Sequence, residues 1–289
     1  MSRITPAAVI LLTTIASHLH AETLQNIEYS DAGGTRLELD ARIPEGRGPF
    51  PGAIIVHGGA WVAGDRRRSV QPLFEPLAEA HIASFSISYR LARPGRDGFK
   101  LPANFSQLAA MGTAIDDVRQ AIGYVKSHAA EYRVDPHRIA LIGESAGAQL
   151  ASMAALRPAP DGGVRAVVDF YGPSDLVKLA QTSMWIPESL RQSLKGTFLE
   201  SMLLGTLRDL SPVNFVSKQA PPFLLIHGTA DTLVPIAQSE DLRAKLRAAG
   251  VHCDLYQVAD GPHGINWWES LGLTAYKAKM AHWLEHQLR

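Results

Sequence analysis

A serine flanked by glycines stands where a strand pattern changes into a helix pattern. Residues 143–147 read Gly-Glu-Ser-Ala-Gly, after the apolar run 138–142 and at the start of a helical stretch over 145–156. A sharp strand-turn-helix connection exposes the serine hydroxyl and needs glycines beside it, because larger side chains would collide. Ser145 is therefore the candidate nucleophile of an acyl-transfer reaction. Glu144 fits either an ordinary turn residue or a functional one.

Two adjacent glycines after an earlier apolar run provide candidate donors for a developing negative charge. An apolar strand leads into His-Gly-Gly-Ala-Trp at 57–61. The backbone N–H groups of Gly58 and Gly59, together with that of Ala146 after the candidate nucleophile, could form an oxyanion hole. His57 is expected to be structural, with its ring hydrogen-bonded to the loop.

One of the eleven histidines stands in a glycine-flanked loop between the last predicted strand and the last predicted helix. It is His263, in the segment Asp-Gly-Pro-His-Gly at 260–264. Such an open loop suits a general base. His282 and His286, a turn apart on the last helix, are expected on its solvated face.

Two aspartates compete for the role of the acid that orients His263. Asp231 follows the buried strand 223–226, at the edge where open α/β sheets meet ligands. Asp260 is three residues from His263 and fits a turn former better. Both aspartates follow Ser145 and precede His263, as the typical order serine, acid, histidine requires. Asp231 is favoured for its place just past the strand.

Three tryptophans are candidates for the walls of a substrate pocket, namely Trp61, Trp185 and Trp267. Trp61 could instead pack beneath its loop, and core packing explains one of Trp267 and its tryptophan neighbour equally well. Trp185 stands in the irregular region 173–212, predicted to be a small cap insertion in which 188–204 has a helical pattern. Because this small insertion can enclose only a small pocket, we expect short or compact acyl groups, acetyl above all.

Charge and motif content argue against several other classes of function. The 28 basic and 28 acidic residues balance, whereas a nucleic-acid or anionic-membrane surface needs a basic excess. Apart from the helical pair His282 and His286, we find no metal-binding spacing and no glycine-rich phosphate loop, so neither a metal nor a cofactor is expected. A small ester or sugar-ester substrate fits this balance. The single cysteine, Cys253, is expected in the core.

Short apolar runs alternate with helical periodicity along the chain. Residues 24–43 form a predicted hairpin around Gly33 and Gly34. The other strands are expected at Ala53 to Val56, Ile82 to Ile87, Arg138 to Ile142, Val164 to Phe170, Phe223 to Ile226 and Val251 to Val258, and the helices at 69–80, 113–130, 145–156, 236–249 and 273–287. The alternation predicts an α/β fold with a mostly parallel, twisted sheet and helices on both faces, in a single domain over 22–289.

The first 21 residues have the features of a secretory signal peptide. Arg3 precedes the apolar run 7–16, and Ala21 ends the segment with a small residue suited to cleavage. A first core helix and a membrane anchor are the alternatives, but the run is short for a bilayer span. We therefore expect a periplasmic or secreted protein without a membrane span after removal of the signal.

Six motifs resemble those of bacterial carboxylesterases related to hormone-sensitive lipase, most closely the feruloyl and acetyl-xylan esterase branch. They are His-Gly-Gly-Ala-Trp at 57–61, Tyr-Arg-Leu at 89–91, Gly-Glu-Ser-Ala-Gly at 143–147, Tyr-Gly-Pro-Ser-Asp-Leu at 171–176, Ser-Pro at 211–212 and Asp-Thr-Leu-Val-Pro at 231–235. The resemblance spans roughly 35–287. It implies the α/β-hydrolase fold and ester hydrolysis by Ser145, Asp231 and His263, with Gly58, Gly59 and Ala146 as oxyanion donors.

The chain departs from that family pattern in three places. Ala60 and Ala148 replace glycines that are usual in the family, and Asn104 to Ile115 looks like an extra stretch. Two other functions stay open. The same fold and triad hydrolyse amides, formamides and peptides, and a non-catalytic binding protein on this fold is conceivable, although such proteins typically lose a triad member.

Overall fold

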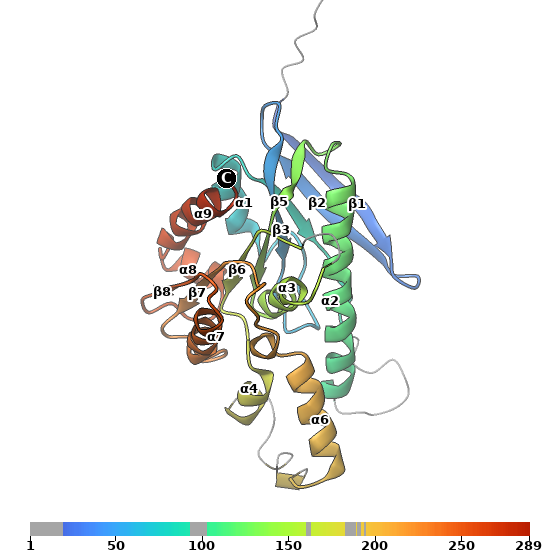
Figure 1. The fold of residues 1–289 in the computed structure, drawn as a ribbon, viewed down its shortest axis with the longest axis vertical. Helices are drawn as coiled ribbons and strands as arrows, with labels where there is room; N and C mark the ends of the chain where they lie inside the picture. Colours follow the sequence, from blue (N-terminus) through green and yellow to red (C-terminus); the bar gives the residue numbers. More distant parts are fainter. Residues whose placement is uncertain (1–19, 93–102, 160–162, 183–188, 190–191, 194) are drawn as a thin grey trace, which may run out of the picture.

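The computed structural model describes residues 20–92, 103–159, 163–182, 189, 192–193 and 195–289 (Figure 1). Its eight-stranded sheet has the order β1-β2-β4-β3-β5-β6-β7-β8. The strands are β1 (Glu22–Asp31), β2 (Arg36–Ile43), β3 (Phe50–Val56), β4 (Ala83–Ile87), β5 (Val134–Glu144), β6 (Ala166–Phe170), β7 (Phe223–Gly228) and β8 (Cys253–Val258). Only the pairs β1–β2 and β2–β4 are antiparallel. The predicted mostly parallel sheet is confirmed.

The predicted strands are all present, with shifted ends. The opening hairpin turns at Gly33 and Gly34, whose φ angles of 65° and 82° favour glycine. β5 differs most, because it begins four residues before the predicted start at Arg138 and continues to Glu144. This strand therefore carries the chain directly to Ser145.

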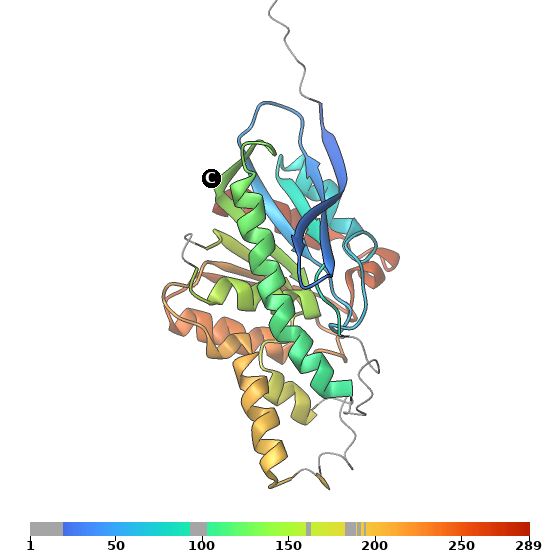
Figure 2. The ribbon, with the colours of Figure 1, turned by 90° about the vertical axis from the view of Figure 1, so that its right-hand side faces the viewer.

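Helices cover both faces of the sheet, as predicted (Figures 1 and 2). They are η1 (Gln71–Leu73), α1 (Phe74–Glu79), α2 (Ala103–Ser127), α3 (Ala146–Leu156), α4 (Leu176–Thr182), α6 (Phe198–Asp209), η2 (Pro212–Asn214), α7 (Ala237–Ala248), α8 (Ile265–Ser270) and α9 (Ala275–Gln287). α2, α3 and α7 pack on one face, and α1, α8 and α9 on the other. Alternate residues of β3 face the two layers: Ile54 packs with α2 and α3, and Ile55 with the opposite layer.

The structure differs from the helix predictions in several places. α2 begins at Ala103 instead of 113, so the stretch that the family comparison marked as extra, Asn104 to Ile115, is the first part of this helix. The predicted helix 69–80 is divided between η1 and α1. α8 was not predicted, because six residues are too few to show a helical period.

The region 173–212 connects β6 to β7 and carries α4 and α6, which extend beyond the carboxyl ends of the parallel strands (Figures 1 and 2). α6 begins at Phe198, where the Thr197 side chain caps it. The predicted helical stretch 188–204 is interrupted by a turn at 195–196, although residues 189, 192 and 193 before that turn are also helical. No residue of α6 is buried. Within the described ranges, no helix is both long and apolar enough to cross a membrane.

Candidate active site

Ser145 occupies a strained turn between β5 and α3. Its φ of 53° lies in a region that non-glycine residues rarely adopt. Its N–H donates to Phe170 O at 2.9 Å. A Cβ on Gly143 would lie 2.4 Å from Gly147 O, and one on Gly147 would lie 2.2 Å from Val56 O. Both predicted glycines are therefore required for this turn to close around the half-buried serine.

Three side chains from the carboxyl ends of β5, β7 and β8 form one continuous hydrogen-bonded chain. His263 Nε2 lies 2.9 Å from Ser145 Oγ, and His263 Nδ1 lies 2.7 Å from Asp231 Oδ2. With its proton on Nδ1, the imidazole donates to Asp231 and offers Nε2 to the serine hydroxyl. The arrangement can therefore remove the hydroxyl proton of Ser145 as an oxygen nucleophile attacks.

Asp231 is buried and held by several donors. Its Oδ1 accepts from the backbone N–H groups of Leu233 and Val234, each at 2.9 Å, and its Oδ2 lies 3.4 Å from Nε2 of buried His227. Burial alone would raise the pKa of Asp231, but its interactions with His227 and His263 outweigh burial and hold that pKa well below its usual range. The acid is thus ionised at neutral pH and can stabilise an imidazolium.

The rival acid lies elsewhere. Asp260 is exposed in a turn, with a φ of 55°, and its N–H donates to Thr229 Oγ1 at 2.8 Å. This placement fits the turn former and favours Asp231. His282 and His286 are exposed on α9, and Cys253 is buried, as expected.

The structure corrects one of the three predicted oxyanion donors. The N–H of Gly58 already donates to Glu144 Oε1 at 2.9 Å within the protein interior, so it is not available to a substrate. The N–H of Ala146, the first residue of α3, has no intrahelical acceptor. Gly59 has a φ of 117°, and a Cβ there would lie 2.1 Å from Ala63 O. Gly59 and Ala146 are the predicted donors that remain.

The loop after β3 is folded back on itself. His57 is buried, its Nδ1 lies 2.7 Å from Gly58 O, and its ring stacks on Tyr89 at 4.4 Å between centroids. Tyr89 Oη donates to His57 O at 2.9 Å. The structural role expected of His57 is confirmed. Ala60 has a φ of 52°, which explains why glycine is usual at this position in the family.

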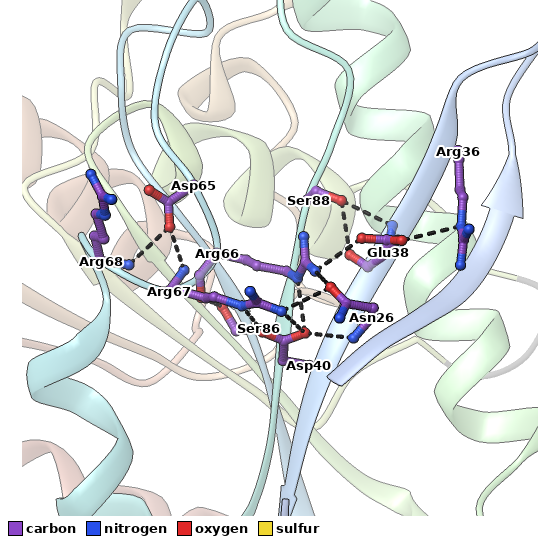
Figure 3. A network of polar contacts seen from close by, with 10 residues as sticks. All are labelled: Asn26, Arg36, Glu38, Asp40, Asp65, Arg66, Arg67, Arg68, Ser86 and Ser88. Atoms are coloured by element: carbon purple, nitrogen blue, oxygen red, sulfur yellow. Dashed lines mark hydrogen bonds and ion pairs between the residues drawn. The ribbon is translucent and has the colours of Figure 1, made fainter. Parts of the chain in front are cut away.

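A polar network anchors the segment 65–68, which follows this loop, to the edge of the sheet. Figure 3 shows Arg66 and Arg67 converging on two acids of β2, Glu38 and Asp40. Arg66 lies 3.0 Å from Glu38 Oε2 and 3.1 Å from Asp40 Oδ1. Burial raises the pKa of Asp40, but hydrogen bonds from Arg67, from a backbone N–H and from Arg66 lower it to about 2. The loop is therefore tied at both of its ends.

The three predicted pocket tryptophans differ in their surroundings. Trp61 is half-buried, packs against the core beside α2 and α3, and donates from Nε1 to Gln149 Oε1 at 3.0 Å, which favours the packing role. Trp267 is 64% exposed, whereas its neighbour Trp268 is fully buried. Trp185 lies outside the described residues.

Two buried polar residues beside the site were not predicted from the sequence. Tyr171 Oη donates to Glu144 Oε2 at 2.7 Å. His227 bonds to Val234 O at 2.8 Å and to Ser239 Oγ at 2.7 Å, beneath the turn that carries the acid. A sequence signal existed for both, because each stands at the carboxyl end of a buried strand, at the same sheet edge as the nucleophile.

Comparisons with known proteins agree with this fold. The family model BD-FAE matches residues 39–246. LipM of Mycobacterium tuberculosis, described as a probable carboxylic ester hydrolase, is 32% identical over 259 residues, which are 84% of this chain and 55% of LipM. The chain thus spans about half the length of the curated relatives it matches.

Solved structures give the same result. A truncated carbohydrate esterase from gut microbiota has a TM-score of 0.71 at 27% identity, covering 94% of this chain and 98% of that one. An esterase from Thermogutta terrifontis has a TM-score of 0.66 at 23% identity, over 90% and 93% of the two chains. The predicted α/β-hydrolase fold and the resemblance to carboxylesterases are confirmed.

Proposed function

The chain belongs to the BD-FAE family, and from that premise we propose that it is a serine hydrolase of carboxylic esters. The observation that carries this proposal is the unbroken hydrogen-bonded chain from Ser145 through His263 to Asp231. The esterase names of its relatives support the choice of reaction.

The proposed reaction has two halves. Ser145 Oγ bonds to the ester carbonyl carbon while its proton passes to His263 Nε2, and Asp231 stabilises the imidazolium. In this proposal the N–H groups of Gly59 and Ala146 bind the carbonyl oxygen as it becomes negative, and one such donor is worth about 3 kcal/mol. The carbon–oxygen bond to the alcohol then breaks, and the alcohol oxygen takes the proton from Nε2. Water repeats these steps on the acyl-enzyme and releases the acid.

We propose short or compact acyl groups, acetyl above all, on a small alcohol or sugar. The described helices of the cap are short, seven residues in α4 and twelve in α6, and give little surface to shelter a long chain. A carbohydrate esterase that this chain covers almost completely is among its structural neighbours, which supports a sugar ester.

The reaction class and the substrate are tested separately. A fluorophosphonate probe should label Ser145 of the intact protein, and an unlabelled protein would contradict a serine hydrolase. The value of kcat/KM on nitrophenyl esters should be highest at acetate and fall towards palmitate, with acetylated xylan and methyl ferulate tested beside them. A maximum at eight carbons or more would refute the compact pocket, and faster cleavage of formamides than of esters would favour the amidase alternative.

We also propose export, with cleavage near Ala21. The support is the apolar run and small residue in the sequence, and residues 1–19 lie outside the described ranges. The intact mass of the protein recovered from its source cell tests this. A soluble cytoplasmic protein that keeps Met1 would contradict it.

A further inference from the structure

The side chain of Glu144 bridges the two loops on either side of Ser145. Its Oε1 accepts from Gly58 N–H at 2.9 Å, and its Oε2 accepts from Tyr171 Oη at 2.7 Å. Tyr171 Oη in turn accepts from Ile265 N–H at 2.8 Å. Through Tyr171, the Glu144 carboxylate thus connects the loop after β3 to Ile265, the first residue of α8, which lies two positions past His263.

Tyr171 is also in contact with the base itself. Its ring centre lies 4.7 Å from that of His263, at an interplanar angle of 62°, and 5.2 Å from that of Trp268. Tyr171 is fully buried, and its φ of 43° shows that its backbone is held in a strained position. A side chain held this firmly can fix the orientation of the imidazole.

The fit around Gly58 is equally close. A Cβ on Gly58 would lie 2.8 Å from Glu144 Oε1 and 2.9 Å from Glu144 O. Gly59 follows Gly58 directly, so a displacement of Gly58 would also move the Gly59 N–H, which is a proposed oxyanion donor. Both partners donate to Glu144, one to each carboxylate oxygen. A glutamine at this position has a single oxygen, so only one of the two donors would keep its acceptor there.

We propose that Glu144 is a positioning residue, which sets the oxyanion donor at Gly59 and the ring of His263 at their working distances from Ser145. The inference rests on the proposed ester hydrolysis. It gives a function to a residue that the sequence left undecided.

The test is a double-mutant cycle with Glu144→Gln, Tyr171→Phe and the double variant, assayed on nitrophenyl acetate. We expect Glu144→Gln to lower kcat about 10- to 100-fold with KM nearly unchanged, because small displacements of reacting groups have effects of that size. The double variant should be no slower than Tyr171→Phe alone. In Tyr171→Phe the donation to Oε2 is already absent, and the glutamine oxygen can still accept from Gly58, so Glu144→Gln then removes no further hydrogen bond and the two effects are not additive.

Glu131→Gln, the same change at an exposed site, is the matched control and should keep the wild-type kcat. Melting temperatures separate positioning from loss of folded protein, because a positioning effect on kcat persists at temperatures where every variant is folded. A wild-type kcat in Glu144→Gln, strictly additive effects, or a loss that follows the folded fraction would each overturn the proposal.

Two further outcomes are decisive. If Glu144→Gln does not fold, Tyr171→Phe carries the test: a lowered kcat with unchanged KM supports the bridge, and a wild-type kcat refutes it. A wild-type protein that is neither labelled at Ser145 nor active would refute the ester-hydrolase proposal and this one with it. An active wild type with an unaffected Glu144→Gln refutes the positioning role alone.

Discussion

The turn around Ser145 and the cap helix α6 both lie beyond the carboxyl ends of the parallel strands, yet they are held very differently. Around the turn, added Cβ atoms at Gly143 and Gly147 would meet backbone atoms at 2.4 Å or less. α6 has no buried residue, and its first residue, Phe198, is 84% exposed. The carboxyl end of α6 is held to the rest of the protein, because Gln149 Nε2 donates to the carbonyl oxygen of its C-cap residue, Leu210, at 2.7 Å.

The difference follows from what each region has to do. A strained backbone persists only where its surroundings over-determine it, and the proposed reaction needs donors and nucleophile placed within fractions of an ångström. The proposed role of the cap, to limit the size of the acyl group, has no such requirement, so loose packing is tolerated there. The backbone is therefore tightly packed around Ser145, whereas the side chains of α6 are exposed.

The largest expected effect comes from removing the reacting groups. Ser145→Ala and His263→Ala should each lower kcat about 10⁵-fold or more, because the members of such a chain act as a unit. Asp231→Asn should lose about 10⁴-fold, since the amide favours the wrong tautomer of His263. All three proteins should stay folded by circular dichroism. Asp260→Asn is the control, and loss of activity there with activity kept in Asp231→Asn would reverse the assignment of the acid.

The same small substitution in the two regions sharpens the comparison. Gly147→Ala places a methyl group 2.2 Å from Val56 O and should cost about 3 kcal/mol or more in the free energy of unfolding. For Gly205→Ala, within α6, no described atom lies within 4 Å of the new Cβ, so helix propensity should raise stability by about 0.5–1 kcal/mol. Urea unfolding measures both. Equal destabilisation by the two changes would show that the cap is as tightly packed as the turn.

An intermediate effect is expected where the segment 65–68 meets β2. Asp40→Asn should destabilise the protein at pH 7 by about 2 kcal/mol, because hydrogen bonds to a charged group are lost. The folded pKa of Asp40, about 2, lies below the value near 4 of an unfolded chain. Its contribution is therefore complete above about pH 4 and disappears as the pH falls towards 2. Urea midpoints at pH 7 and pH 3 should show a smaller gap between variant and wild type at pH 3, and an equal gap would contradict the ion pairing.

The smallest effect is expected in the exposed cap. Phe198→Ser removes a ring that is 84% exposed and should change the free energy of unfolding by no more than about 0.5 kcal/mol. The value of kcat/KM on nitrophenyl acetate should also stay close to that of the wild type. A loss of more than 2 kcal/mol in a melting experiment would mean that α6 packs more firmly than its exposure indicates.

Local patterns determined much of this protein. The glycines beside Ser145 could be identified from sequence, because a strand-turn-helix junction excludes side chains there whatever surrounds it. The alternation of apolar runs and helical periods predicted the layered sheet, because each face of a strand or helix has to be buried. Ser145, Asp231 and His263 each follow a predicted strand along the chain, so they were expected together at the carboxyl edge of the sheet. All of these inferences depend on neighbours within a few residues or on the order of elements.

Only the tertiary structure decided matters that depend on contacts between distant residues. The N–H of Gly58 donates to Glu144, 86 residues away, and is therefore not available to the proposed oxyanion site. No local sequence pattern predicts that pairing. The structure likewise buries Trp268 and exposes Trp267, although they are neighbours with the same side chain. A hydrogen bond or a buried ring requires two surfaces that meet only when the chain is folded, so periodicity along the chain cannot reveal which donor is already satisfied.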